Sequence, residues 1–351
     1  MIATRTPFRI TLGGGGTDLP SFYSVHGGFI FAMTIDKYMY VMLNPSIIDR
    51  KVRLHYSQSE TVNTSRELRH ELAREALLLH GIENSIEISS LAELPGGTGL
   101  GSSSCYLVGL LTALHHLRRD FVSLQQVAEE ACHIELNILK KGIGKQDQYM
   151  AVFGGLTTLD IGRDGAVDVR NVQVGAGSIA GLSANMHLYY TGLQRDALEV
   201  LADQNTALKD RPHQRNQAAE SLLSIKELGY RFLDSVKNED YDLFGTLLHE
   251  HWVIKKSLSN KISSSHIDQL YELVRREYGV LGGKIVGAGG GGFLMLYCPR
   301  HHRHLEEFML SHGMPRMHYT LENEGSKIVA SLGSVPLRVN ASFAQAASSV
   351  Y

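Results

Sequence analysis

Cysteine is scarce in this chain of 351 residues, which contains only Cys105, Cys132 and Cys298. Three widely spaced cysteines do not make a disulfide framework, and their spacing does not match that of a zinc site. Cysteines that stay reduced are typical of the cytoplasm. We therefore expect a cytoplasmic protein without structural disulfides and without a cysteine-bound metal.

Charge of one sign and long hydrophobic runs are also missing. The formal net charge is −2 at pH 7, which gives no electrostatic basis for binding nucleic acid or an acidic membrane surface. No apolar run approaches the roughly 18 residues of a membrane-spanning helix, and we expect no signal peptide at the N-terminus. The expected partner is a small molecule rather than nucleic acid or membrane, and the sequence does not indicate the oligomeric state.

Glycine and serine, in contrast, are concentrated in a loop at residues 94–104. This loop has four glycines and three serines between a strand-like run and an apolar helical run. Glycines let the backbone turn sharply, and the unpaired amides at a helix start favour phosphate. The loop matches neither G-x-x-x-x-G-K-[ST] nor G-x-G-x-x-G. It predicts a phosphate site in another fold, and the alternative is an ordinary capped helix after a flexible loop.

Strand-like and helix-like segments occur in both halves of the chain. Runs rich in β-branched and aromatic residues predict strands, and apolar residues spaced by three or four predict helices. The strands are expected at residues 8–12, 29–43, 52–56, 85–91, 156–161, 186–191, 284–288 and 292–298, with short strands near 317–319 and 327–329. The helices are expected at residues 66–80, 105–117, 123–141, 196–208, 214–237, 240–257, 265–278 and 301–312. We therefore predict two α+β domains, residues 1–185 and 186–351, with a cleft between them.

Two further glycine-rich segments lie near the ends of the chain, at residues 13–16 and 287–292. The first follows a strand, so that a polar ligand can approach its backbone. Asp18, just beyond it, is able to accept hydrogen bonds from a hydroxyl-rich substrate, and Arg9 is able to bind an anion. Either segment alone is compatible with a simple turn. Three such segments in one chain suggest several loops around one ligand.

Two acidic side chains, Glu135 and Asp147, lie between the second and third glycine-rich segments. A glycine break before Asp147 allows the chain to turn back, so both carboxylates are able to face the serine-containing loop. One carboxylate and one serine hydroxyl suit Mg²⁺, which completes its shell with water and phosphate. The other carboxylate would accept the proton of an attacking hydroxyl. The alternative is that both acids are solvated surface charges.

In chain order, the three glycine-rich segments match the three signature motifs of the GHMP small-molecule kinases. The chain resembles this superfamily over essentially its whole length, and the middle motif is the most specific. Residues 12–20, 35–38 and 144–149 are most similar to those of the bacterial D-glycero-D-manno-heptose 7-phosphate kinases. The resemblance implies an α+β fold with a ribosomal S5 domain 2-like N-terminal domain and a ferredoxin-like C-terminal domain.

The same resemblance implies roles for individual residues. Asp147 is expected to be the catalytic base with Arg9 beside it, and Ser103 and Glu135 are expected to hold Mg²⁺. The phosphates of ATP are expected at Pro95, Gly96, Gly97, Thr98, Gly99, Leu100, Gly101, Ser102, Ser103 and Ser104. The sugar is expected at Gly15, Gly16, Thr17, Asp18, Asp36, Lys37, Gly289 and Gly290.

The activity implied is phosphorylation of the anomeric hydroxyl of a heptose 7-phosphate, for nucleotide-activated heptose used in surface polysaccharides. Galactokinases carry Gly-Glu-His-Thr-Asp where this chain has Gly-Gly-Gly-Thr-Asp at residues 14–18, so galactose is not expected as the substrate. A kinase for L-fucose or free heptose and a non-catalytic sugar sensor are the alternatives. The phosphate of the substrate needs a cationic pocket, for which the candidates are Lys37, Lys141, Lys145 and Arg195.

Overall fold

Two β-sheets organise the chain in a computed structural model that describes residues 1–46, 48–193, 197–209 and 217–333. Within these residues the first sheet has the order β12-β1-β2-β5-β3-β4, and β6 pairs with β2 and β7. Its strands are β1 (Ile2–Gly13), β2 (Gly28–Pro45), β3 (Val52–His55), β4 (Ser59–Val62), β5 (Ile86–Ala92), β6 (Leu156–Ile161), β7 (Val167–Asn171) and β12 (Lys327–Ser331). The second sheet has the order β11-β8-β10-β9, with β8 (Met186–Tyr190), β9 (Gly282–Ile285), β10 (Phe293–Tyr297) and β11 (Arg316–Met317).

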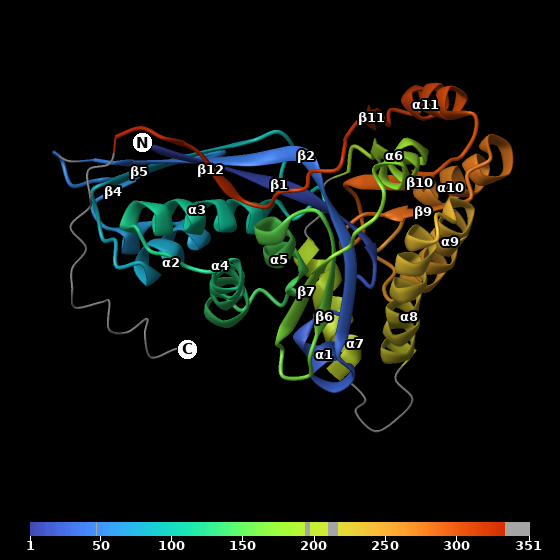
Figure 1. The fold of residues 1–351 in the computed structure, drawn as a ribbon, viewed down its shortest axis with the longest axis horizontal. Helices are drawn as coiled ribbons and strands as arrows, with labels where there is room; N and C mark the ends of the chain where they lie inside the picture. Colours follow the sequence, from blue (N-terminus) through green and yellow to red (C-terminus); the bar gives the residue numbers. More distant parts are fainter. Residues whose placement is uncertain (47, 194–196, 210–216, 334–351) are drawn as a thin grey trace.

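Helices cover both sheets (Figure 1). Beneath the first sheet lie α2 (Glu71–Leu79), α3 (Ser102–Arg118), α4 (Leu124–Cys132) and α5 (Gln146–Phe153). The second sheet is accompanied by α6 (Ala176–Asn185), α8 (Gln217–Lys237), α9 (Tyr241–Lys256), α10 (Ser265–Tyr278) and α11 (His302–Ser311). Near the junction lie the two contacting helices α1 (Pro20–His26) and α7 (Ala197–Lys209). The predicted α+β class is confirmed.

The long β1–β2 pair holds the two ends of the molecule together. Residues 39–45 of β2 pair with β5, whereas residues 28–33 pair with β6. Helix α8 contacts both β1 and β2, so the second half of the chain packs against the first sheet. The end of β1 at Gly13 therefore lies where the two parts meet, and this places the first glycine-rich segment.

The predicted domain division at residue 185 coincides with the start of β8, but it does not describe the end of the chain. Strand β12 returns to the first sheet and pairs antiparallel with β1, with Ile2 opposite Ser331. Residues 327–331 are therefore part of the first sheet and not of a separate domain 186–351. The outer edge of β1 is free to pair with this strand because β2 occupies its other edge.

The predicted helix at residues 123–141 is divided. Ser123 caps α4 by accepting a hydrogen bond from the Gln126 amide at 3.1 Å. After Cys132 the helix widens into a π-helical turn, His133–Ile138. Such turns are frequent at functional sites, and this one carries Glu135.

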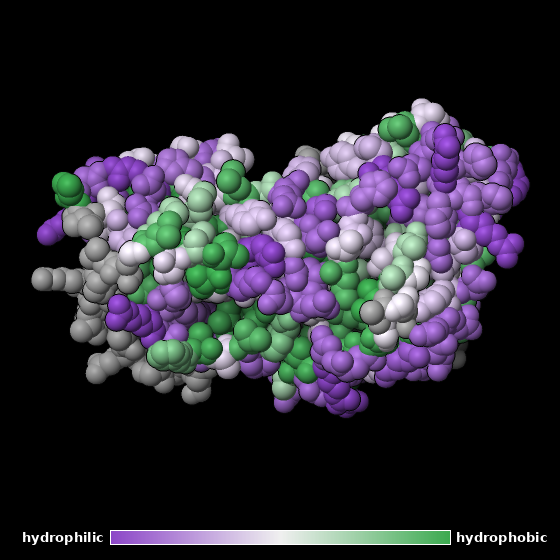
Figure 2. Space-filling view, turned by 45° about the horizontal axis from the view of Figure 1, so that its top comes forward, coloured by the Kyte–Doolittle hydropathy of each residue, from purple (hydrophilic) through white to green (hydrophobic). Residues whose placement is uncertain are grey.

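No helix in the described part of the chain combines the length and the apolar character needed to cross a membrane. On the face drawn in Figure 2, hydrophobic side chains gather toward the left and the middle. The end formed by the C-terminal helices is mostly hydrophilic on the same face. The face of that end seen in Figure 2 is therefore suited to contact with water.

Candidate active site

A pocket of about 720 Å³ is lined by residues from both halves of the chain. All three glycine-rich segments reach it: Gly15 and Gly16 from the first, residues 96–99 and Gly101 from the second, and Gly287 from the third. The prediction that several loops surround one site is therefore confirmed. The volume is that of a typical small-molecule site.

The second and third glycine-rich segments touch backbone to backbone. Gly99 has a φ of +78°, and a Cβ atom there would lie 2.6 Å from the Val286 carbonyl oxygen. Gly292 has a φ of +83°, and its Cβ would lie 2.2 Å from the Thr98 carbonyl oxygen. Only glycine satisfies both the left-handed backbone and the contact distance. The glycines thus allow two loops from distant parts of the sequence to form one wall.

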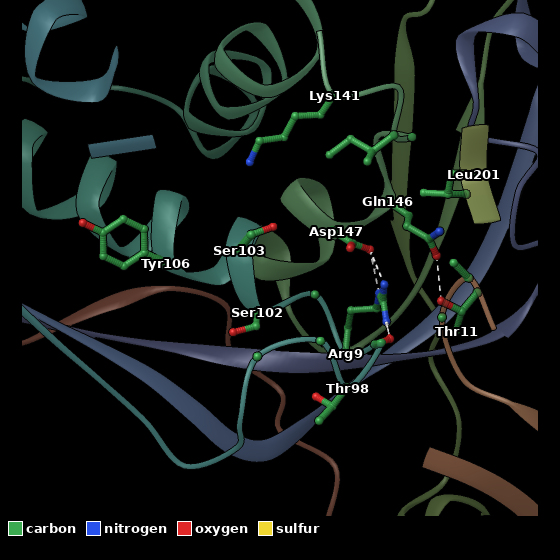
Figure 3. Close-up of a pocket in the computed structure, with 18 of the residues that line it drawn as sticks. Arg9, Thr11, Thr98, Ser102, Ser103, Tyr106, Lys141, Gln146, Asp147 and Leu201 are labelled. Atoms are coloured by element: carbon green, nitrogen blue, oxygen red, sulfur yellow. Dashed lines mark hydrogen bonds and ion pairs between the residues drawn. The ribbon is translucent and has the colours of Figure 1, made fainter. Parts of the chain in front are cut away.

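The start of α3 faces the pocket with free amides. Its N-cap is Gly101, with a φ of +86°, and no side chain caps the helix. The first-turn N–H groups have no partner inside a helix and carry a partial positive charge. Ser102 and Ser103 lie at this helix start and line the pocket (Figure 3). The arrangement offers an anion several amides and two hydroxyls at once.

Not every residue of the predicted phosphate loop lines the pocket. Leu100 is fully buried, and its carbonyl accepts a hydrogen bond from the Arg9 amide at 3.2 Å. The Pro95 carbonyl accepts a hydrogen bond from Thr98 Oγ1 at 3.1 Å. Ser104 is buried and donates to Glu135 at 2.6 Å. These three residues shape the loop from behind rather than facing a ligand.

Arg9 and Asp147 form an ion pair at the centre of the pocket (Figure 3). Nε and Nη2 of Arg9 lie 2.7 and 2.6 Å from Oδ1 of Asp147, and Nη1 donates to the Gly99 carbonyl at 2.5 Å. Oδ2 of Asp147 has no hydrogen bond with the described residues, and a Cβ on Gly101 would lie 3.4 Å from it. The guanidinium thus fixes one carboxylate oxygen and leaves the other beside the start of α3.

Glu135 is fully buried beside the same helix start. Its Oε2 accepts hydrogen bonds from Ser104 Oγ at 2.6 Å and Gln148 Nε2 at 2.5 Å. Its Oε1 lies 3.4 Å from both Ser103 Oγ and Lys141 Nζ, the side chains of which line the pocket. A carboxylate oxygen next to a serine hydroxyl is a donor set that Mg²⁺ accepts. Ser103 and Glu135 therefore fit the predicted metal ligands.

The first glycine-rich segment contributes two residues with different surroundings. Asp18 lines the pocket but is buried, and its Oδ2 accepts a hydrogen bond from the Gln146 amide at 3.0 Å. Burial, partly offset by this hydrogen bond, raises the pKa of Asp18 to about 6. Thr17 does not line the pocket, because its hydroxyl lies 2.8 Å from the carbonyl oxygens of both Gly14 and Phe29. Thr17 holds the loop, which corrects its prediction as a sugar ligand.

Four other predicted sugar ligands lie away from the pocket. Asp36 accepts hydrogen bonds from the amide and hydroxyl of Thr320 at 2.8 and 2.9 Å, and Lys37 pairs with Asp36 at 3.2 Å. Gly289 and Gly290 face Ile262, whose carbonyl accepts from the Gly290 amide at 2.8 Å. The third segment meets the pocket through Gly287 and Ala288 instead. Residues 36–37 and 289–290 therefore contact neighbouring segments of the chain rather than the pocket.

Among the lysines proposed for the substrate phosphate, only Lys141 lines the pocket. Lys145 is bound by Glu129 at 3.0 Å and by the Gly165 carbonyl at 2.8 Å. Arg195 lies outside the described residues. The pocket instead contains Lys255 and Lys284, which the sequence reasoning missed. The sequence does contain one indication of Lys284, because it is a charged residue within an otherwise apolar strand, where charged residues are rare.

Gly144 lies against Asp18 just before α5, and we expect it to set the position of Asp147. A Cβ atom on Gly144 would lie 1.9 Å from Oδ2 and 2.3 Å from Cγ of Asp18. Because Asp18 is buried and holds the Gln146 amide, Gly144→Ala is expected to displace the start of α5. We expect kcat/KM to fall by about tenfold to a hundredfold. Gly177→Ala, where a Cβ would meet nothing within 4 Å, is the matched control, and equal activities of the two variants would contradict this role.

Comparisons with known proteins show that the chain is similar to small-molecule kinases. Residues 63–155 match the family described as GHMP kinases N terminal domain, and residues 232–309 match GHMP kinases C terminal. The D-glycero-alpha-D-manno-heptose 7-phosphate kinase of Campylobacter jejuni is 26% identical over 307 residues, covering 84% of this chain and 89% of that protein. The L-fucokinase/L-fucose-1-P guanylyltransferase of Bacteroides fragilis is 26% identical over 333 residues, covering 83% of this chain but 34% of that protein.

Solved structures show the same fold. A D-glycero-D-manno-heptose 1-phosphate kinase from Bacteroides thetaiotaomicron superposes with a TM-score of 0.77 at 20% identity, covering 95% of this chain and 100% of that chain. Lactococcus lactis galactokinase complexed with galactose superposes with a TM-score of 0.73 at 17% identity, covering 93% of this chain and 94% of that chain. The two-domain architecture is thus shared with kinases of different small molecules.

Proposed function

The chain belongs to the GHMP kinase family of phosphotransferases with an alcohol acceptor, and on that premise we propose that it phosphorylates the anomeric hydroxyl of D-glycero-D-manno-heptose 7-phosphate with ATP. The observation that carries the proposal is the Arg9–Asp147 pair, which lies beside the open helix start of α3 in one pocket. The product would enter the formation of nucleotide-activated heptose for surface polysaccharides.

Two features favour a heptose phosphate over other acceptors. The Campylobacter relative that matches most of this chain is a heptose 7-phosphate kinase. Residues 14–18 lack the Glu-His pair of galactokinases, which argues against galactose. L-Fucose is the second candidate, because a fucokinase is equally identical to the chain.

The residues have separate tasks in the proposed reaction. The amides of the second glycine-rich segment and of the first turn of α3 bind the phosphates of ATP. Oδ2 of Asp147 accepts the proton of the sugar hydroxyl as the hydroxyl oxygen attacks the γ-phosphorus of ATP, and the bond from that phosphorus to ADP breaks, so that ADP leaves. Arg9 fixes the carboxylate through Oδ1 and stabilises the negative charge of the transferring group. Phosphoryl transfer depends mainly on such alignment and charge neutralisation.

Mg²⁺ is the implied metal, and Ser103 and Glu135 would hold it. When bound, it neutralises charge on the phosphate oxygens. The chain itself prepares the site, because Ser104 and Gln148 fix Oε2 of Glu135 and leave Oε1 toward Ser103. The Lys141 ammonium lies beside Oε1 and balances the buried carboxylate.

ADP release with a panel of sugars tests the proposed function. We expect the highest kcat/KM with D-glycero-D-manno-heptose 7-phosphate, compared with the unphosphorylated heptose, mannose, galactose and L-fucose. A clear preference for L-fucose would establish the second candidate instead. Sugar binding without ADP release from any member of the panel would indicate a non-catalytic sensor and contradict the proposal.

A further inference from the structure

Three basic side chains form a cluster in the wall of the pocket that the second half of the chain supplies. His251 and Lys255 lie one turn apart on α9, and Lys284 lies on the adjacent strand β9. All three line the pocket, although their exposed fractions are only 1%, 8% and 2%. Buried basic groups are costly unless something balances their charge, so the surroundings of these three require an explanation.

No carboxylate in the described part of the chain forms an ion pair with these three residues. Lys255 Nζ donates to the carbonyls of Ile285 and Gly287 at 2.9 and 2.5 Å, and Lys284 Nζ donates to the Leu12 carbonyl at 2.8 Å. An ammonium has three donors, so both lysines retain donors after these bonds. Both ring nitrogens of His251 are buried without any hydrogen-bond partner. The cluster is therefore rich in unused donors.

The basic groups also lower one another's pKa values. Burial, together with the nearby Arg9 guanidinium, lowers the pKa of Lys255 to about 7. Burial and the charges of Lys255 and Arg9 lower the pKa of Lys284, and burial with both lysines lowers that of His251. Only Arg9 in this group has a carboxylate partner, Asp147. A dianionic group in the pocket would restore the charged forms and balance them.

We propose that Lys255, Lys284 and His251 form the binding site for the phosphate group that the sugar substrate already carries. This inference rests on the proposed function, and it identifies the residues that distinguish a sugar phosphate from a free sugar. The position of Lys284 indicates that the cluster lies in the part of the pocket that would bind the acceptor sugar. It bonds to Leu12, directly before the glycine-rich segment whose Gly15 and Gly16 line the pocket. The helix start of α3, which serves ATP in the proposal, comes from a different segment.

Steady-state kinetics with two acceptors test this assignment. The acceptors are D-glycero-D-manno-heptose 7-phosphate and the same heptose without phosphate. For Lys284→Met we expect KM for the phosphorylated acceptor to rise about tenfold or more, because charged hydrogen bonds are lost. KM for ATP is expected to stay within about twofold, and kcat/KM is expected to fall less for the free heptose than for the phosphorylated acceptor. Lys226→Met is the control, because Lys226 donates to the backbone carbonyls of His26 and Gly27, as Lys284 does to that of Leu12, but it does not line the pocket.

The variant His251→Phe guards against misfolding. It loses no hydrogen bond, and it keeps an aromatic ring near Phe232, whose centroid is 6.2 Å away. We expect KM for the phosphorylated acceptor to rise about threefold to tenfold in this variant. An equal change for both acceptors, or a change in KM for ATP instead, would overturn the proposal. The latter result would assign the cluster to the phosphates of ATP.

Binding without nucleotide separates this inference from the proposed function. Isothermal titration calorimetry of the wild-type protein and of His251→Phe with each acceptor requires no turnover. Weaker binding of the phosphorylated acceptor alone in the variant would support the site even if no ADP were released. Equal affinities of wild type and variant for the phosphorylated acceptor would overturn it, even if the wild type were an active kinase.

Discussion

Replacement of Asp147 by asparagine is expected to lower kcat by about 10²- to 10⁴-fold, the range for loss of a general base. Asparagine keeps the shape of the side chain, and its Oδ1 can still accept from Nε and Nη2 of Arg9, as Oδ1 of Asp147 does. The variant therefore changes only the negative charge and the oxygen beside Gly101. Its dissociation constant for ATP, measured by isothermal titration calorimetry, is expected to stay within about twofold of the wild-type value.

Asp168→Asn is the matched control for this variant. Asp168 also pairs with an arginine, Arg170 at 2.5 Å, but it lies on the exposed strand β7 and does not line the pocket. Its replacement is expected to leave kcat unchanged. If Asp147→Asn retained near-normal turnover, Asp147 would not be the base, and the assignment of the proton acceptor would have to be abandoned.

Replacement of Arg9 by glutamine is the second change with a large expected effect. The guanidinium makes contacts with both Asp147 and the Gly99 carbonyl, and it is 4% exposed. Its removal leaves the carboxylate without its cation and the transferring group without a fixed positive charge. We expect kcat to fall by about 10²- to 10³-fold, as for the loss of one electrostatic donor, with folding monitored by circular dichroism.

Arg9→Lys separates charge from geometry. Lysine keeps the positive charge but lacks the planar fork that reaches Asp147 and Gly99 together. Because the resemblance places lysine here in many relatives, we expect Arg9→Lys to retain more activity than Arg9→Gln. Equal kcat values for the two variants would show that the charge of Arg9 does not contribute to the reaction.

The grouping of the proposed catalytic and metal-binding residues could be predicted because they belong to motifs of fixed order. The structure brings Arg9 and Asp147 into contact and places Ser103 beside Glu135, from four separate segments. Helix α5, which carries Asp147, escaped the sequence reasoning. It has only eight residues, and it follows two glycines that also fit a loop. A short helix therefore positions the proposed catalytic base.

The acceptor side of the pocket was harder to predict. A polar residue in a motif, such as Thr17 or Asp36, is able to bind either a ligand or a neighbouring chain segment, and sequence does not distinguish the two. Both bind chain segments in the structure. Lys255 and Lys284 were missed because they belong to no motif. The packing of α9 against β9 and the hydrogen bond from Lys284 to Leu12 on β1 bring them to the pocket.

The return of the chain to the first sheet also lay beyond sequence reasoning. Strand β12 has five residues, and no pattern in them indicates that they pair with the start of the chain. The pairing depends on an edge of β1 left open by the rest of the fold. Short edge strands of this kind are specified by tertiary contacts more than by local propensity.

The position of the new phosphate tests the central claim most directly. D-glycero-D-manno-heptose 7-phosphate, ATP and Mg²⁺ are incubated with the protein, and the product is analysed by ³¹P nuclear magnetic resonance with proton coupling. We predict a second phosphate monoester whose phosphorus couples to the anomeric proton, and formation of this product at least about a hundredfold more slowly with Asp147→Asn. A product phosphorylated at another hydroxyl, or no second phosphate at all, would contradict the account.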